Sequence, residues 1–120
     1  MSTANLASKK CVPCEGIEKP FDKTKALDYM QNVPGWQLDE QGKAIFRDYN
    51  TKNFMTAVKF INDIAGIAEA ENHHPDLHLT GYRKLKIVLS THAIGGLSEN
   101  DFIVASKIND VPVELKQDKK

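Results

Sequence analysis

The longest run of helical periodicity lies in the middle of the chain. It constrains the fold most, because the flanking segments must pack around one long helix. Apolar residues recur there at spacings of three and four over about five turns: Phe54, Val58, Ile61, Ala65 and Ala68. Asn53 can cap the start of this run, and Pro75 disfavours helical geometry in the residue before it. We predict one long helix from Asn53 to about Glu71, with its exit at 72–75.

Short runs of alternating or β-branched residues flank this helix on both sides. The runs 36–39 and 44–49 come before it, and the runs 77–80 and 85–90 come after it. Turn residues separate the members of each pair, which is typical of β-hairpins. The chain should therefore form one hairpin on each side of the long helix.

Two further helices are expected near the ends of this pattern. Residues 21–32 carry apolar side chains at near-helical spacing behind Asp22, a candidate N-cap. Ser98 and Asp101 have the spacing of a capping box, which predicts a helix from Ser98 to about Asn109. The order α-β-β-α-β-β-α then indicates an α+β fold, a four-stranded, mainly antiparallel sheet with helices packed on one face.

The 120 residues suffice for one domain with its own core. We expect a flexible N-terminal leader at 1–20, a single domain at 21–115 and a polar tail at 116–120. Cys11 and Cys14 form a CxxC pair in the leader. No second cysteine pair completes a four-ligand zinc site, so we interpret them as two reduced thiols.

Charge and hydropathy exclude several classes of function. Sixteen basic and sixteen acidic residues cancel, and no basic stripe predicts nucleic-acid binding. No stretch approaches the roughly 18 apolar residues of a membrane span, and the first residues lack the apolar core of a signal peptide. The expectation is a soluble, cytoplasmic protein.

Histidines gather in the second half of the chain, within twenty residues: His73, His74, His78 and His92. Solvated side chains, a metal site and acid–base catalysis are the competing interpretations. Glu69 lies four residues before His73, so both should share a helix face and form a hydrogen bond that orients the imidazole. The pair His74 and His78 spans Pro75 and lacks the continuous helix face of a helical zinc motif. Acid–base catalysis near neutral pH is the interpretation that these positions favour.

A specific pattern contains these histidines. It consists of Glu69, the run His73-His74-Pro75, then Tyr82, His92 and Asp101 at set spacings. This pattern resembles the signature of the pterin-4a-carbinolamine dehydratases. The resemblance extends from about residue 21 to about residue 108, and the leader lies outside it.

The resemblance implies dehydration of 4a-hydroxytetrahydrobiopterin to the quinonoid dihydropterin in tetrahydrobiopterin recycling, without a metal or cofactor. It implies His73, His74, His92 and Glu69 as catalytic residues. It also implies contacts with the pterin from His73, His74, His92 and Asp101, although the N3 position of Asp101 gives it an equal case for a capping role. Which histidine acts as acid and which as base stays open.

Two positions have a structural interpretation instead. His78 falls outside the signature and should be a surface strand residue. Tyr82 belongs to the signature, but we expect it in the core rather than in the wall of the site.

The same resemblance carries a second hypothesis from another class. Some members of the family act as dimerisation partners of a transcription factor, so the chain could be a binding module with a nuclear pool besides its cytoplasmic one. Members also form homodimers and homotetramers, and free sheet edges offer a route to such assembly. Because every site position is present, catalysis is the favoured function.

Overall fold

The computed structural model describes residues 19–116. Along the chain run α1 (Lys23–Met30), β1 (Gln37–Leu38), β2 (Ile45–Asn50), α2 (Phe54–Glu71), β3 (Asp76–Thr80), β4 (Lys84–Leu89), a 3₁₀-helix η3 (His92–Ile94) and α3 (Glu99–Asn109). Cys11, Cys14 and nearly all of the predicted leader and tail lie outside the described residues, so the domain boundaries at 20 and 115 stay a prediction.

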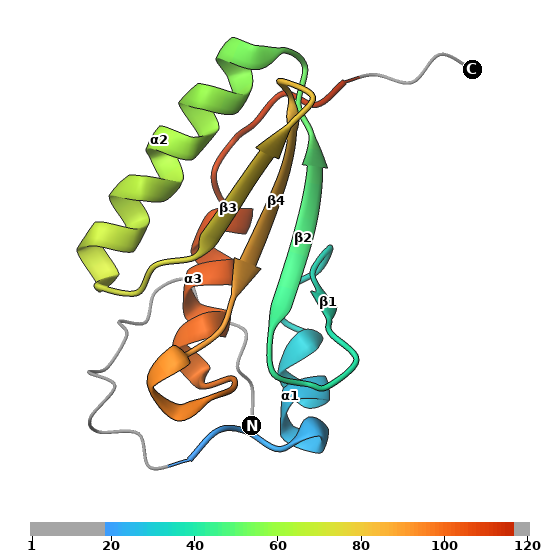
Figure 1. Ribbon diagram of the computed structural model, residues 1–120, viewed down its shortest axis with the longest axis vertical. Helices are drawn as coiled ribbons and strands as arrows, with labels where there is room; N and C mark the ends of the chain where they lie inside the picture. The colour runs from blue at the N-terminus through green and yellow to red at the C-terminus, as the bar shows by residue number, and fades with distance from the viewer. Residues whose placement is uncertain (1–18, 117–120) are drawn as a thin grey trace.

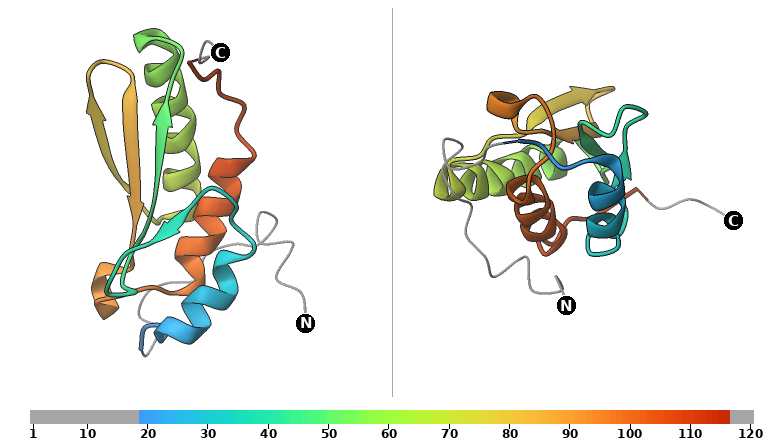
Figure 2. Two further views of the ribbon diagram at one scale, coloured as in Figure 1. Left: turned by 90° about the vertical axis from the view of Figure 1, so that its right-hand side faces the viewer. Right: turned by 90° about the horizontal axis from the view of Figure 1, so that it is seen from below.

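The strands form one antiparallel sheet in the order β1-β2-β4-β3. The three α-helices lie on one face of this sheet, as the side view in Figure 2 shows, and α2 runs along the strands. The predicted α+β class, the element order and the one-sided helix layer are confirmed (Figure 1).

Strand β4 shows how the sheet divides into two faces. Leu85, Ile87 and Leu89 are buried toward the helices, whereas Lys84 and Lys86 are exposed on the other face. This alternation follows from the two-residue period of a strand. It gives the molecule a helix-covered apolar face and an open polar one.

The central strand β2 carries one perturbed group on the helix-covered side. Tyr49 is buried against Phe60, with ring centroids 4.7 Å apart. Burial raises the pKa of the Tyr49 phenol above its ordinary value, and the Arg47 guanidinium, 4.4 Å from the ring centroid, acts in the opposite direction. This group lies in the core rather than among the histidines.

The long helix α2 begins and ends where the sequence predicts. Asn53 caps it by accepting from the Thr56 N–H at 2.8 Å. The apolar stripe read from the sequence is not the line that faces the core, however, because the buried positions of α2 are Ala57, Phe60, Ile64, Ala68 and Glu71. Phe54 is 49% exposed, and only Ala68 is common to the two sets. The apolar surface of α2 is broader than one stripe, and packing against the sheet and α3 selects which line of it is buried.

Helix α3 is fixed to its neighbours through its last turn. The Asn109 side chain accepts from the Trp36 indole N–H at 2.8 Å and from Arg47 at 2.7 Å. Lys107 lies 3.6 Å from the buried Glu71 carboxylate at the end of α2. The last turn of α3 is thereby held against the end of α2, Trp36 and β2.

One sequence prediction about the β3–β4 turn is wrong. Tyr82 is 58% exposed and has a left-handed φ of 55°, so it is not a core residue. Tyr82 lies in the turn between β3 and β4, outside the strand alternation that buries every second side chain of β4.

Candidate active site

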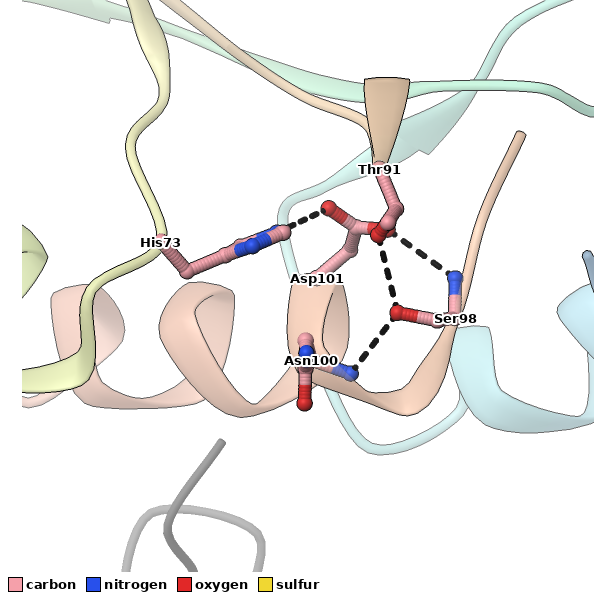
Figure 3. A network of polar contacts seen from close by, with 5 residues as sticks. All are labelled: His73, Thr91, Ser98, Asn100 and Asp101. Atoms are coloured by element: carbon pink, nitrogen blue, oxygen red, sulfur yellow. Dashed lines mark hydrogen bonds and ion pairs between the residues drawn. The ribbon is translucent and has the colours of Figure 1, made fainter. Parts of the chain in front are cut away.

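The site centres on Asp101 in the first turn of α3. Its side chain is completely buried and accepts hydrogen bonds on both oxygens (Figure 3). Oδ1 lies 2.7 Å from His73 Nε2. Oδ2 accepts from Thr91 Oγ1 at 2.8 Å and from the Ser98 backbone N–H at 3.0 Å. The carboxylate therefore connects three separate segments of the chain.

Helix α3 positions Asp101 through the predicted capping box. Ser98 is the N-cap, its hydroxyl accepts from the Asn100 N–H at 3.2 Å, and Asp101 at N3 bonds back to the Ser98 backbone. A negative side chain in the first helical turn is also favoured by the helix dipole. The one carboxylate both caps α3 and contacts His73.

The exit of α2 delivers His73 to this carboxylate. Asn72 ends the helix in the left-handed conformation, with φ 53°, and the His73 N–H bonds to the Ala68 carbonyl at 3.1 Å. The chain leaves the helix axis at this point, and His73 turns inward until it is 7% exposed. Its ring reaches the first turn of α3.

The hydrogen bond between His73 and Asp101 has a defined donor and acceptor. An ionised carboxylate can only accept hydrogen bonds, so His73 donates through Nε2–H. In the neutral ring the lone pair is then on Nδ1. A buried carboxylate behind an imidazole stabilises the cation that forms when Nδ1 takes a proton.

The predicted pairing of Glu69 with His73 is wrong. Glu69 lies 2.7 Å from His74 Nε2 instead, in a pair whose side chains are 79% and 55% exposed. The left-handed Asn72 interrupts the helix before His73, so the i, i+4 relation that would have aligned Glu69 with His73 does not hold. The turn brings His74, one residue further on, over the last turns of α2.

His92 lies on the loop that follows β4. The strand ends at Leu89, and His92 is the first residue of η3 and is exposed. A bridge between Thr91 and Gly96 closes the loop. His92 directly follows Thr91, whose hydroxyl bonds to Asp101, and this brings its loop to the same carboxylate as His73.

His78 lies away from Asp101, on the open face of the sheet. It is exposed on β3, and with Asp48, Lys84 and Lys86 it lines a hollow of about 420 Å³ on the open face of the sheet. The prediction of a surface strand residue is confirmed.

Thr91, and the contact of the Ser98 hydroxyl with it, were not predicted from the sequence. Both side chains are buried, with Oγ atoms 2.8 Å apart. The capping-box spacing indicated that Ser98 caps a helix, but no local pattern shows that Thr91 meets it across the η3 loop. The neighbouring position of Thr91 and His92 was the available signal.

Within residues 19–116, no three histidine, cysteine, aspartate or glutamate side chains gather as a metal site would require. Over the same residues, the helices are too short or too polar to cross a membrane.

The fold and site define an α+β protein with a buried carboxylate–histidine pair, Asp101 and His73, between the exit of α2 and the first turn of α3. Residues 19–111 match the family model described as Pterin 4 alpha carbinolamine dehydratase, and the chain belongs to this family. The resemblance on which the sequence analysis relied is confirmed.

Individual relatives agree with this membership. The mitochondrial pterin-4-alpha-carbinolamine dehydratase 2 of Arabidopsis thaliana is 47% identical in a match of 116 positions that covers 94% of this chain and 62% of that protein. A relative from Halorhodospira halophila is 43% identical over 105 residues, covering 88% of this chain and 95% of its own length.

Solved structures support the fold. A transcriptional coactivator/pterin dehydratase from Brucella melitensis is 30% identical and superposes with a TM-score of 0.70 over 76% of this chain and 96% of its own. A pterin dehydratase-like protein identified as a RuBisCO assembly factor in the alpha-carboxysome shares the fold at 16% identity, with a TM-score of 0.53 over 62% of this chain and 86% of its own.

Proposed function

We propose that the chain is a hydro-lyase that dehydrates 4a-hydroxytetrahydrobiopterin to the quinonoid dihydropterin and water. The C4a–O bond breaks as a proton reaches the departing oxygen, and the C4a–N5 double bond forms as the N5 proton leaves. The reaction therefore needs one proton donor and one proton acceptor. The observation that carries the proposal is the buried His73–Asp101 contact, together with family membership.

In this proposal His73 accepts the N5 proton through Nδ1. Its Nε2–H is committed to Asp101 Oδ1, and the carboxylate stabilises the imidazolium that results. His92 and His74 are exposed, so they can exchange protons with water, and one of them supplies the proton for the departing oxygen. Glu69 orients His74 rather than His73.

All three histidines contact the pterin in this proposal. Asp101, predicted as a further pterin contact, has both oxygens engaged by protein groups and acts instead through His73. No step calls for a metal or a cofactor, because proton transfers alone balance the reaction.

The test is a rate measurement with purified protein. The ultraviolet signal of a 4a-hydroxytetrahydropterin should disappear faster with the wild-type protein than in buffer, and His73→Ala should remove most of the acceleration. His78→Ala is the matched control, because it deletes an exposed imidazole on the open face of the sheet and should retain the wild-type rate. A wild-type rate equal to that of buffer would refute the proposal.

The physiological setting is part of the same proposal. We place the chain in tetrahydrobiopterin recycling, in the cytoplasm, whereas the Arabidopsis relative is named as mitochondrial. Fractionation with an antibody against the chain would separate the two compartments.

We also propose that the chain assembles into a homodimer or homotetramer. The part of α2 that the core leaves uncovered carries Phe54 and Met55, 49% and 71% exposed, and the line through Val58 and Ile61 is only partly buried. Exposed apolar area of this kind on a helix supports association. Sedimentation should give a mass above 13.4 kDa, and Met55→Glu should lower it.

The same surface supports the alternative of a binding module, and the Brucella neighbour is named as a transcriptional coactivator as well as a dehydratase. A transcription-factor partner captured by His73→Ala protein as well as by wild type would establish that role independently of catalysis.

A further inference from the structure

The Thr91 hydroxyl occupies the centre of the polar network behind the site. Thr91 is completely buried, and its Oγ1 lies 2.8 Å from Asp101 Oδ2 and 2.8 Å from Ser98 Oγ (Figure 3). It approaches Asp101 from the loop after β4, whereas His73 approaches from the exit of α2. The two residues therefore bond to opposite oxygens of one carboxylate.

The hydrogen atoms in this network can be assigned from the chemistry of the groups. The Asp101 carboxylate only accepts, so Thr91 spends its single hydroxyl proton on Oδ2. The 2.8 Å contact between the hydroxyls must then be donated by Ser98, whose own oxygen accepts from the Asn100 N–H. The bonds run in one direction, from the Asn100 backbone through Ser98 and Thr91 to Asp101.

The hydrogen bonds to Asp101 Oδ2 also determine how the carboxylate meets His73. With Oδ2 saturated by Thr91 and by the Ser98 N–H, the carboxylate cannot rotate without breaking buried bonds, and Oδ1 stays aimed at His73. Successive bonds of the same sense also polarise one another. The network thereby holds the His73 ring in one orientation, with its proton on Nε2.

Thr91 also holds the segment that carries His92. Its backbone N–H donates to the Gly96 carbonyl at 2.7 Å, and its carbonyl accepts from the Ile94 N–H at 3.2 Å. Through its side chain it contacts Asp101, and through its backbone it closes the η3 loop around His92. One buried residue thus joins the supports of both histidines.

We propose that Thr91 is a positioning residue of the dehydratase: its hydroxyl fixes Asp101, which sets the tautomer and orientation of His73, and its backbone sets the His92 loop relative to them. The inference rests on the proposed function for its kinetic consequences. Its structural content concerns the resting protein, so it can be tested separately.

The test replaces the hydroxyl by a methyl group of nearly the same shape. In Thr91→Val, ¹⁵N NMR of the histidine rings should show His73 losing its uniform Nε2–H tautomer and exchanging between forms. The kcat for 4a-hydroxytetrahydropterin dehydration should fall about tenfold to a hundredfold, as small misplacements of catalytic groups do, while KM changes little. Thr91→Ser keeps the donor and should restore both the tautomer and most of kcat.

Thr51→Val is the matched control for stability. Thr51 is also completely buried, and its hydroxyl donates at the far end of β2, to the Asn53 carbonyl at 3.0 Å or the Arg83 carbonyl at 2.9 Å. Its loss should lower the melting temperature about as much as Thr91→Val does, with no change in the His73 tautomer or in kcat.

The outcomes separate the two claims. A wild-type protein without dehydratase activity would refute the proposed function and leave the tautomer measurement to decide the role of Thr91. An unchanged tautomer and kcat in Thr91→Val would refute the positioning role even if the wild type is an active dehydratase. A fall in kcat matched by Thr51→Val would also refute it, because lost stability would then explain the effect.

Discussion

Two neighbouring histidines each meet a carboxylate oxygen at 2.7 Å, yet the two pairs lie in opposite environments. His73 and Asp101 have 7% and 0% of their side chains exposed, whereas His74 and Glu69 have 55% and 79% exposed. The same bond length therefore describes a buried contact with further hydrogen bonds behind it and a solvated pair on the end of a helix.

This difference shows that distance alone does not measure how much such a contact contributes to stability. Water screens the exposed pair, and holding two mobile side chains together costs entropy, so surface pairs contribute about 0–1 kcal/mol. In the buried pair, loss of one partner strands the other without water, which costs about 3–5 kcal/mol. Burial of Asp101 is what distinguishes the two histidines chemically.

The largest effect is expected for Asp101→Asn, which keeps the shape of the side chain and removes the charge. An amide no longer stabilises a His73 imidazolium, and its NH₂ group can donate toward Nε2 and favour the wrong tautomer. We expect kcat to fall about a thousandfold or more. Steady-state kinetics of Asp101→Asn and His73→Ala, measured together, test this. A loss of kcat below about tenfold would mean that the Asp101 charge does not support His73 in catalysis.

The buried pair should also contribute more than the exposed pair to the free energy of unfolding. Asp101→Ala removes the partner of His73 and one half of the capping box, so the free energy of unfolding should fall by about 3 kcal/mol. Glu69→Ala should change it by less than about 0.5 kcal/mol. Urea denaturation of the two variants makes the comparison, and equal losses would contradict it.

A smaller effect is expected for His74→Gln. His74 is one of two exposed candidates for the proton donor, and it has no buried partner. If His92 supplies the proton, kcat should fall only about tenfold, through weaker contact with the pterin. The double variant with His92→Gln should then lose at least as much as His73→Ala. A His74→Gln loss as large as that of His73→Ala would assign the donor to His74.

The smallest effect is expected for Glu69→Gln. The variant keeps a hydrogen-bond acceptor for His74 and removes a screened charge, so kcat should stay within about threefold of wild type. Raising the salt concentration on the wild-type protein should shrink even this difference. If Glu69→Gln instead behaves like Asp101→Asn, then Glu69 takes part in proton transfer.

Much of the fold was accessible from the sequence because its signals are local. The capping box at Ser98 and Asp101, the cap at Asn53 and the stop before Pro75 depend on neighbouring residues, and the structure has the helix ends there. The hairpins likewise follow from alternation and turn residues. The prediction that Tyr82 is buried was wrong because its burial depends on what covers the turn, which no local pattern describes.

The site divides along the same line. The sequence by itself determined the histidine cluster, the family pattern and a capping role for Asp101, since each is a matter of residue type and spacing. Only the tertiary structure decided that His73 meets Asp101, that Glu69 meets His74, and that Thr91 completes the network. For the two histidines the physical reason is the left-handed Asn72, which ends α2 and turns the chain so that His73 meets a partner 28 positions away. Thr91 reaches Asp101 through the loop after β4, a contact between two segments that no local pattern describes.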